Sequence, residues 1–556
     1  MKKYILIILC ILLSANMLQA QVKREVEVTR DYIPIVEKAQ KPHIKASIAD
    51  TTQISPDVDY SITPLSINTS LKSRAINPAK VTYWEYNRPH TAQLKVGAGY
   101  PLNSLLQGVI STQNASVGYL AARVDHCGFY SDIETFDGFS KQNATQILND
   151  ASVAGGLYFK NKILAVDAHY LNNSYRNYAF NQHADNRIGY QGYGAEVSFG
   201  DDFKNLETFN YATSVSADSY FDRAMNSTNS LNADVDFGHI VSPGKLLYGA
   251  NYSHIDEGEA YGVDNFGLYA ELATKLLRLD VIVGLDYNRY YTSTYGEDNV
   301  RNYMIPRVLI KKARSVALIG YFKFGGSLID NSFKSLSMEC PFVMGGSSHV
   351  NPTSELYGMV GIEGLVAKGR LSYDLNIKMS QRDNNRYWAM NIFELSAQHI
   401  HNSYITASYG DLDIFSVNAE LAFRPWSNLK FAFDAHYNAF HVDKSSAYVN
   451  SLPRFEGALS AEYSARRLTV GAKVRYLGER SFAVNRYSPT AATSNSLPIA
   501  QLPNVVDLSL FADYKLLDRV SIFAQGSNLC NENIYEWALY RGFGASFTAG
   551  VKVNFR

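Results

Sequence analysis

The chain ends in Ala545-Ser-Phe-Thr-Ala-Gly-Val-Lys-Val-Asn-Phe-Arg556, a stretch whose alternate positions have opposite character. Every second residue from Ala545 to Phe555 is apolar, whereas the residues between them are small, polar or charged. Because the side chains of a strand point alternately to its two faces, this segment has one apolar and one polar face. Most strands of globular proteins have only five or six residues. A strand of about 9–11 residues crosses a bilayer at a tilt, and the terminal segment has that length.

The same alternation recurs along most of the chain. Clear examples are residues 93–100, 164–170, 371–379, 429–438, 454–463 and 468–476. A soluble sheet would give one or two such strands, whereas a closed barrel needs them to the end of the chain, because lipid cannot satisfy an open sheet edge. We therefore predict an all-β protein, a large antiparallel transmembrane β-barrel of the outer-membrane type over residues 91–556. We expect about 22 strands, within a range of about 20–24. The first strand, near Ala92–Tyr100, should pair with the last.

Composition excludes several other classes of protein. The chain has 556 residues, with 52 Lys and Arg against 52 Asp and Glu, so no net field would attract nucleic acid. No run of 18 or more apolar residues marks a spanning helix. The chain is rich in aromatic residues, with 39 Tyr and 28 Phe, yet its mean hydropathy is only −0.17. This combination favours a membrane barrel over a bundle of membrane helices.

The connections between the predicted strands alternate in length. Counted back from the C-terminus, the short ones are residues 515–518, 464–467, 424–428, 367–370 and 312–315. The long ones are residues 529–542, 479–503 and 441–452, and the longest is 327–355. In outer-membrane barrels the short turns are periplasmic and the long loops extracellular. Aromatic residues should form two girdles, with Phe455, Tyr476, Tyr437 and Phe547 at the extracellular rim and Tyr463, Tyr514, Phe423 and Phe555 at the periplasmic rim. Residues 387–409 look irregular.

The N-terminus differs in kind from the barrel. Residues 1–20 combine a basic start, an apolar run from Tyr4 to Leu13 and a small residue at Ala20, which is the pattern of a secretory signal peptide. Together with the barrel, this predicts the outer membrane of a Gram-negative bacterium. Residues 21–90 are proline-rich and polar and lack a core, so we expect an extended periplasmic or lumenal segment. Within it, one short stretch could add as a strand to a partner, and its docking candidates are Val26, Val28, Tyr32, Ile33 and Ile35.

The C-terminal residues also resemble a known family. The run Asp507-Leu-Ser-Leu-Phe-Ala-Asp-Tyr, the run Arg519-Val-Ser-Ile-Phe-Ala-Gln-Gly-Ser-Asn528 and the terminal strand are similar to the end of a TonB-dependent receptor barrel. The match covers about the last fifty residues. The resemblance implies an N-terminal plug inside the barrel, and a folded domain of that kind needs roughly 100 residues or more. Residues 21–90 are too few, so we expect a receptor-like barrel without the plug and without coupling to TonB.

Polar positions of the predicted strands should face a water-filled lumen. The lumen-lining candidates are Asp167, His169, Asp374, Lys378, Lys430, Asp434, His436, Glu456, Glu462, Lys473, Arg475 and Lys552. Two Asp-x-His pairs among them have the residue types of a hydrolase, but mixed polar lining explains them better. His399 and His401 have the spacing of metal ligands at a predicted periplasmic turn, with no third ligand in view. We expect no enzyme activity and no cofactor.

The cysteines of the mature chain give no framework for the fold. Cys127, Cys340 and Cys530 are far apart in the sequence and form neither a disulfide pattern nor a metal motif. All three fall towards the extracellular side of the predicted topology. Free thiols are the expectation, although one pair could meet there.

Two classes of function follow. The first is a barrel that passes a solute through its polar lumen. The alternative is a structural or assembly component of an outer-membrane complex, which docks a periplasmic or lipoprotein partner through residues 21–90. Lipid of the outer membrane is the surrounding solvent in either case, and no nucleic-acid partner is expected.

The barrel closes between its first and last strands, so residues 21–90 are not needed for insertion. A chain whose signal peptide is joined directly to about Lys80 should still insert and still migrate as a heat-modifiable species on a gel. Loss of insertion would show that the segment acts as a plug in spite of its length.

Overall fold

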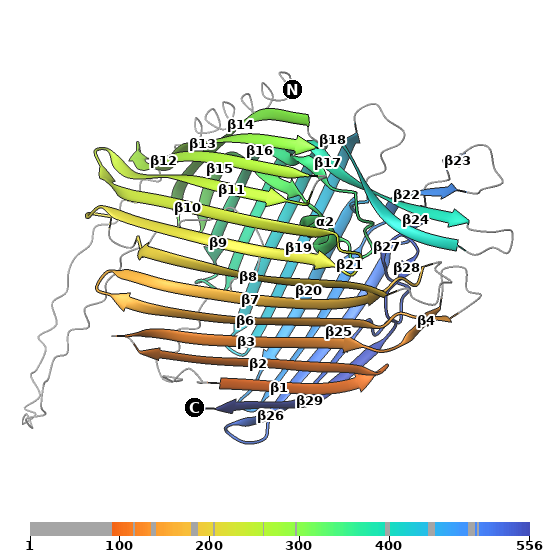
Figure 1. Ribbon diagram of the computed structural model, residues 1–556. Coiled ribbons are helices and arrows are strands. Elements are labelled where there is room, and N and C mark those ends of the chain that lie inside the picture. The colour runs from red at the N-terminus through yellow and green to blue at the C-terminus, as the bar shows by residue number, and fades with distance from the viewer. Residues whose placement is uncertain are drawn as a thin grey trace, which may run out of the picture. The chain divides into compact units, whose positions relative to one another are not determined.

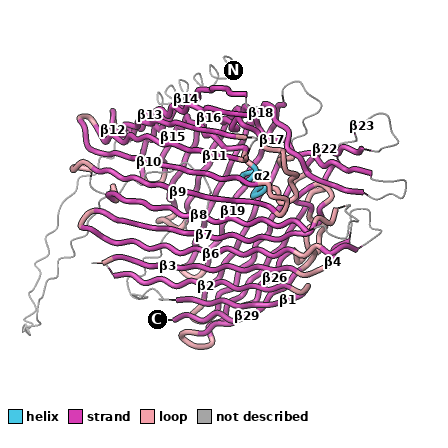
Figure 2. Tube along the Cα trace, in the orientation of Figure 1, coloured by secondary structure: helices cyan, strands magenta, loops and turns pink. Residues whose placement is uncertain are grey.

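The structure is a computed structural model that describes residues 92–114, 117–134, 141–179, 187–203, 206–258, 261–294, 297–394, 401–442, 451–487, 495–496 and 500–555. Residues 1–91, which hold the predicted signal peptide and the docking candidates, lie outside the described residues. Almost all of the described chain is β-strand, and its single helix is short (Figure 2). No helix in these ranges is long and apolar enough to cross a membrane.

A closed antiparallel barrel of 22 strands makes up most of the described chain (Figure 1). This confirms both the predicted fold class and the predicted strand number. The barrel strands, in the order in which they pair, are β1 (Ala92–Tyr100), β2 (Asn103–Asn114), β3 (Gly118–Phe129), β6 (Gln146–Phe159), β7 (Lys162–Arg176), β8 (Arg187–Asp201), β9 (Asn210–Asp222), β10 (Ser227–Val241), β11 (Gly244–Asp256), β12 (Gly262–Leu276), β13 (Leu279–Thr294), β14 (Glu297–Ser315), β15 (Leu318–Asn331), β16 (His349–Val366), β17 (Leu371–Glu394), β18 (His401–Trp426), β19 (Leu429–Val442), β20 (Phe455–Ser464), β21 (Leu468–Leu477), β25 (Val505–Lys515), β26 (Val520–Ser527) and β29 (Ser546–Phe555).

The remaining elements lie in the longer connections at one rim. They are β4 (Asp132–Glu134), β5 (Lys141–Asn143), α2 (Phe333–Glu339), β22 (Arg480–Tyr487), β23 (Asn495–Ser496), β24 (Ala500–Leu502), β27 (Tyr535–Trp537) and β28 (Tyr540–Arg541). Among them, β22 pairs in parallel with the far end of β17.

The barrel is closed by β1 and β29, as the sequence predicts. Their register runs without a break from Ala92 opposite Phe555 to Tyr100 opposite Phe547. Gly97 lies opposite Gly550 in this ladder. A Cβ on Gly97 would come within 2.8 Å of the Phe523 ring, and one on Gly550 within 2.7 Å of it. The two glycines therefore leave room for an aromatic ring against the inside of the closing seam.

The connections between strands are short at one rim of the barrel and longer at the other, as the alternating lengths in the sequence predict. β1 begins and β29 ends at the same rim, where neighbouring strands are joined by short turns (Figure 1). The long connections, including 332–348, 478–504 and 528–545, all lie at the opposite rim. Short turns are periplasmic in outer-membrane barrels, so the long connections are extracellular.

The structure corrects three details of the sequence prediction. The connection predicted at 327–355 is shorter, because β15 continues to Asn331 and β16 begins at His349. In the stretch 387–409, predicted to be irregular, residues 387–394 and 401–409 continue β17 and β18 as a regular antiparallel ladder past one bulge. His401 begins β18 opposite Glu394 at the extracellular end of this ladder, so the periplasmic position predicted for it is wrong, whereas His399 lies outside the described residues. The ends of β17 and β18 pack against the extracellular loops and not against lipid. The alternation expected of a lipid-facing strand therefore does not detect them.

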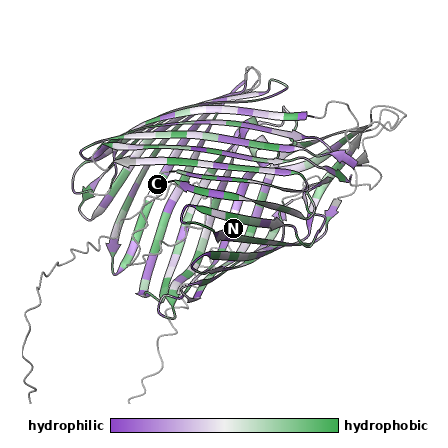
Figure 3. Cartoon of the chain, turned by 90° about the horizontal axis from the view of Figure 1, so that it is seen from below, coloured by the Kyte–Doolittle hydropathy of each residue, from purple (hydrophilic) through white to green (hydrophobic). Residues whose placement is uncertain are grey.

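Many apolar residues are exposed along the barrel wall, and they appear as green segments of its strands in Figure 3. Leu459 is 51% exposed, Val153 52% and Leu268 59%, and each lies in the middle of a strand. Exposing such a side chain to water rather than burying it costs about 1.5–3 kcal/mol, so dozens of them require lipid as the solvent. Of the predicted girdle aromatics, those exposed on the surface are Phe455, Tyr437, Phe547, Tyr463, Tyr514, Phe423 and Phe555.

The facing of the wall can be tested by substitution on β20 and β21. Replacing the lipid-facing Leu459 with Arg should reduce barrel stability by about 2–4 kcal/mol, because it places a charge in the apolar band. Lys473→Ala, on the opposite face of the adjacent strand, should change stability little. Urea titration of refolded barrels in vesicles measures both, and equal losses would contradict the assigned facing.

Candidate functional site

The residues predicted to line the lumen alternate along their strands with the exposed apolar residues of the outer face. Each therefore points to the barrel interior. They lie on β7 (Asp167, His169), β17 (Asp374, Lys378), β19 (Lys430, Asp434, His436), β20 (Glu456, Glu462), β21 (Lys473, Arg475) and β29 (Lys552). The passage of a solute along these lumen-lining residues stays a prediction.

Many of these side chains are paired with a residue on another strand, one or two strands away around the wall. Lys552 Nζ lies 2.5 Å from Asp513 Oδ2, and Lys378 Nζ lies 2.6 Å from Glu355 Oε1. The Tyr321 hydroxyl donates to Asp374 Oδ1 at 2.6 Å. A partly exposed ion pair such as Lys552–Asp513 contributes about 0–1 kcal/mol, so it shapes the charge of the wall more than its stability.

The structure does not assemble either Asp-x-His pair into a catalytic arrangement. His169 Nε2 lies 2.9 Å from Asp218 Oδ1 on β9, and His436 Nδ1 lies 2.8 Å from Asn418 Oδ1 on β18. Each imidazole is thus held by a residue of another strand, two strands away for His169 and on the adjacent strand for His436, and not by the acid two positions before it. No group of three or more His, Cys, Asp or Glu within the described ranges could hold a metal ion.

Three of the predicted residues come together in one pocket of the wall. Lys430, Glu462 and Lys473 line a cavity of about 390 Å³ with Phe511 and Gln525. Lys430 lies directly opposite Glu462 in the ladder. Lys473, by contrast, has no ion pair with another described residue. The pocket offers an ammonium group, amide and hydroxyl groups and one aromatic face to a polar solute.

A second part of the wall is strongly acidic. Seven carboxylates point inward from β3, β6, β7, β8, β9 and β10, and we call them the acidic arc: Asp125, Asp150, Asp167, Glu196, Asp218, Asp234 and Asp236. Three basic groups lie among the described residues of the arc: Arg123 pairs with Asp125, and both His169 and Lys334 of α2 pair with Asp218. Asp150 and Glu196 have neither a hydrogen bond nor an ion pair to the part of the chain that the structure describes.

Carboxylates in the acidic arc also lie directly opposite one another. Asp125 is the register partner of Asp150, and Asp167 is the partner of Glu196. Like charges in such positions destabilise a sheet, so their placement favours a solvated lumen that attracts positive charge. Of these seven residues the sequence prediction identified only Asp167. The same alternation in residues 118–129, 146–159 and 187–241 would have identified the others.

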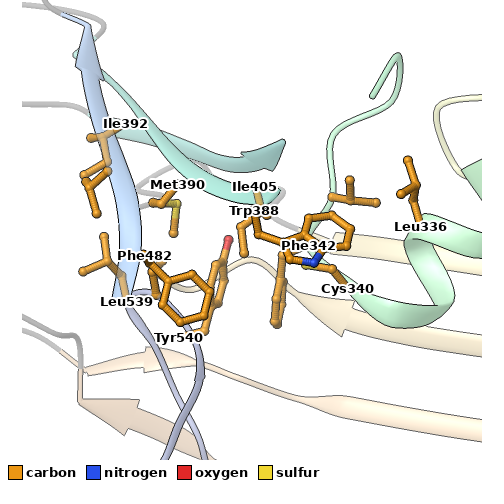
Figure 4. Close-up of a cluster of buried hydrophobic side chains, with 14 of the residues drawn as sticks. Leu336, Cys340, Phe342, Trp388, Met390, Ile392, Ile405, Phe482, Leu539 and Tyr540 are labelled. Carbon is orange, nitrogen blue, oxygen red and sulfur yellow. The ribbon is translucent and has the colours of Figure 1, made fainter. Parts of the chain in front are cut away.

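Extracellular loops pack together across the mouth of the barrel. We call this assembly the outer cap. It consists of residues 332–348, the end of β17 from residue 385 to 394, the beginning of β18 from residue 401 to 410, β22 with β24, and residues 528–545. One buried hydrophobic cluster joins these segments to the ends of β7, β8 and β9 (Figure 4). Strands β9 to β16 separate β8 from β17 around the wall, so the cluster connects distant sectors of the barrel.

Aromatic residues form the centre of the outer cap. The Phe342 ring stacks on the Tyr540 ring with a centroid distance of 3.7 Å. The Tyr540 hydroxyl donates to Asn177 Oδ1 at 2.7 Å, which ties the loop before β29 to the end of β7. Trp388 and Trp537 meet edge to face with centroids 5.2 Å apart. Stacked and edge-on aromatic pairs contribute about 0.5–1.5 kcal/mol beyond their burial, so this centre holds the loops firmly.

Helix α2 is anchored at its beginning by the tops of β10 and β11. The Glu257 carboxylate accepts a hydrogen bond from the backbone N–H of Phe333 and one of 2.8 Å from the Thr228 hydroxyl. The first N–H groups of a helix have no partner within the helix, and its N-terminus favours negative charge. The Glu257 carboxylate accepts a hydrogen bond from one of these groups and places a negative charge beside them. Burial raises the pKa of this carboxyl group, although its hydrogen bonds oppose that shift.

Arg386 on β17 anchors the rest of α2. Its Nη1 lies 2.6 Å from Glu339 Oε2, and its Nη2 donates to Ser335 Oγ at 2.6 Å. Its Nε donates to Asn331 Oδ1 at 2.7 Å. One side chain, 10% exposed, thus holds both ends of the helix against the extended hairpin.

The three cysteines are free, as expected from their spacing. Cys340 is fully buried in the outer cap, and this burial raises the pKa of its thiol well above the usual value. It packs as an apolar residue.

Comparison with known proteins agrees with this fold. No protein-family model matches the sequence, and a search of curated proteins found no match. Among solved structures, the chain is similar to the pyoverdine outer membrane receptor FpvA from Pseudomonas aeruginosa PAO1, with 12% identity, a TM-score of 0.64 and coverage of 84% of this chain and 78% of that one. The copper transporter OprC matches with 13% identity, a TM-score of 0.60 and coverage of 84% and 80%. The FrpB iron transporter from Neisseria meningitidis matches with 10% identity, a TM-score of 0.63 and coverage of 84% and 81%.

These similarities define the class of protein by its fold. The chain has the 22-stranded outer-membrane barrel of TonB-dependent receptors. The resemblance seen in the last fifty residues is therefore confirmed for the barrel. The expected lack of a plug stays a prediction, since residues 21–91 lie outside the described ranges.

The anchoring of α2 can be tested at Arg386. Arg386→Gln removes the charged group that satisfies Asn331, Ser335 and Glu339, so it should lower the local stability of the outer cap by about 2–5 kcal/mol. Trypsin should then cleave the reconstituted barrel at Lys334 at least about tenfold faster.

Arg289→Gln is the matched control, because Arg289 lies on β13 against the Tyr291 ring, away from α2. Equal cleavage of both variants would show that Arg386 does not hold the cap.

Proposed function

We propose that this protein is a transport barrel of the Gram-negative outer membrane that passes a polar solute, with preference for positively charged solutes, through a lumen gated by the outer cap. The acidic arc is the observation that carries this proposal. Inward carboxylates without a basic partner, such as Asp150 and Glu196, attract cations and repel anions, and their charge does not stabilise the wall.

The outer cap supports the gating part of the proposal. Its segments belong to loops, and polar anchors such as Arg386 and Glu257 hold them. Contacts of this kind can exchange for contacts with a solute without disturbing the barrel wall, because the hydrogen bonds of the wall lie outside the cap.

Solved structures with this fold include receptors and transporters. One is described as bound to pyoverdine and another as a copper transporter. The fold is therefore compatible with uptake, and we propose no enzymatic role for this chain. We keep the docking of a periplasmic or lipoprotein partner through residues 21–90 as a separate proposal, and a solved complex of the same fold with pyocin S2 shows that such barrels bind proteins.

Planar-bilayer recordings test this proposal. The wild-type barrel should conduct little, because the cap spans its mouth. The variant Phe342→Ala/Arg386→Gln should conduct measurably more and should favour potassium over chloride. Adding Asp150→Asn and Asp167→Asn to that variant should lower the permeability ratio by about twofold or more, because two charges of the acidic arc are lost.

The matched control is Asp298→Asn with Asp518→Asn, which removes two exposed carboxylates near the rims. Its permeability ratio should stay unchanged. A loosened cap with no conductance would reject transport and favour partner docking, whereas an anion-selective channel would reject the role of the acidic arc.

A further inference from the structure

The periplasmic rim carries a cluster of basic residues at one sector. Three neighbouring turns, at residues 366–371, 424–429 and 464–468, join β16 to β17, β18 to β19 and β20 to β21. They contain five basic residues and no Asp or Glu: Lys368, Arg370, Arg424, Arg466 and Arg467. The four arginine side chains have neither a hydrogen bond nor an ion pair with the described residues. Positive charge is therefore concentrated here without compensation.

These turns enclose a groove of about 1060 Å³. Arg370, Arg424 and Arg466 line it together with Trp426 and Tyr463. Backbone hydrogen bonds hold the turns side by side: the Arg424 N–H donates to the Arg370 carbonyl at 2.7 Å, and the Ser464 N–H donates to the Asn428 carbonyl at 2.8 Å. The groove is thus a built feature of the rim.

The groove is continuous with the lipid-facing surface. Trp426 is 66% exposed and Tyr463 41%, and both mark the lower edge of the apolar band. Trp and Tyr favour the level of the lipid headgroups, so the arginines beside them lie where lipid phosphates lie. A guanidinium group matches the geometry of a phosphate by donating two parallel hydrogen bonds.

We propose that this groove binds the headgroup of an anionic phospholipid of the periplasmic leaflet. The acyl chains would lie along the apolar band above Tyr463, towards the middle of the membrane, and the phosphate would lie among Arg370, Arg424 and Arg466. Basic pockets at membrane boundaries bind anionic lipids in this way. A protein partner would need no contact with the apolar band, so the position of the groove favours a lipid.

Native mass spectrometry of the purified full chain, titrated with phosphatidylglycerol or phosphatidylcholine, tests the proposal. The wild type should bind phosphatidylglycerol more tightly than phosphatidylcholine. The variant R370Q/R424Q/R466Q should lose about tenfold or more of its affinity for phosphatidylglycerol and keep its affinity for phosphatidylcholine. Heat-modifiable migration on a gel shows that the variant barrel is folded.

The matched control is R278Q/R314Q/R519Q, which removes three exposed arginines at the same rim, two from other turns and one from the end of β14. Its phosphatidylglycerol affinity should stay within about twofold of the wild type, because those arginines border no groove of this kind. Equal binding by the wild type and R370Q/R424Q/R466Q would overturn the proposal. Displacement of the lipid by millimolar inorganic phosphate would overturn it in favour of a free-anion site. Polyglutamate serves as a probe for an acidic protein partner. If R370Q/R424Q/R466Q lost binding of polyglutamate but bound phosphatidylglycerol like the wild type, the groove would be assigned to such a partner and the lipid proposal would be overturned.

Discussion

The structure depends on the hydrogen-bonded ladder between β1 and β29. In lipid, an unpaired strand edge would leave a row of backbone groups without partners, and each would cost several kcal/mol. The unbroken register from Ala92 opposite Phe555 to Tyr100 opposite Phe547 removes both edges at once. Every other strand then has two neighbours, and the wall needs no hydrophobic core of its own.

Closure separates the chemistry of the two faces. Outward side chains such as Leu459 only have to be apolar, because lipid is their solvent. Inward side chains face water and are free to carry charge, so pairs such as Asp125 opposite Asp150 are tolerated there. The strand ladder supplies the stability of the wall, and the lumen can be tuned for a solute without weakening it.

The outer cap follows a different rule from the wall. It contains a buried core of the kind found in soluble domains, built from loops whose strands lie far apart around the barrel. Phe342, Tyr540 and Trp388 approach each other because the barrel holds the ends of their loops in place. The cap is therefore a small packed unit supported by the wall, and its contacts can change while the wall stays intact.

The sequence by itself determined the barrel, its strand number, its closing pair and the side of its long loops. It could do so because lipid imposes a local rule, in which every second residue of each strand must be apolar. The same rule identified the inward position of Lys552 and Asp167, although most of the acidic arc was overlooked. Only the tertiary structure decided how β17 and β18 extend, which loops meet in the outer cap and which turns enclose the basic groove. Those features depend on contacts between residues such as Arg386 and Glu339, or Arg370 and Arg424, which are distant in sequence and follow no period. The closed barrel brings them together, and no local pattern of the chain records that proximity.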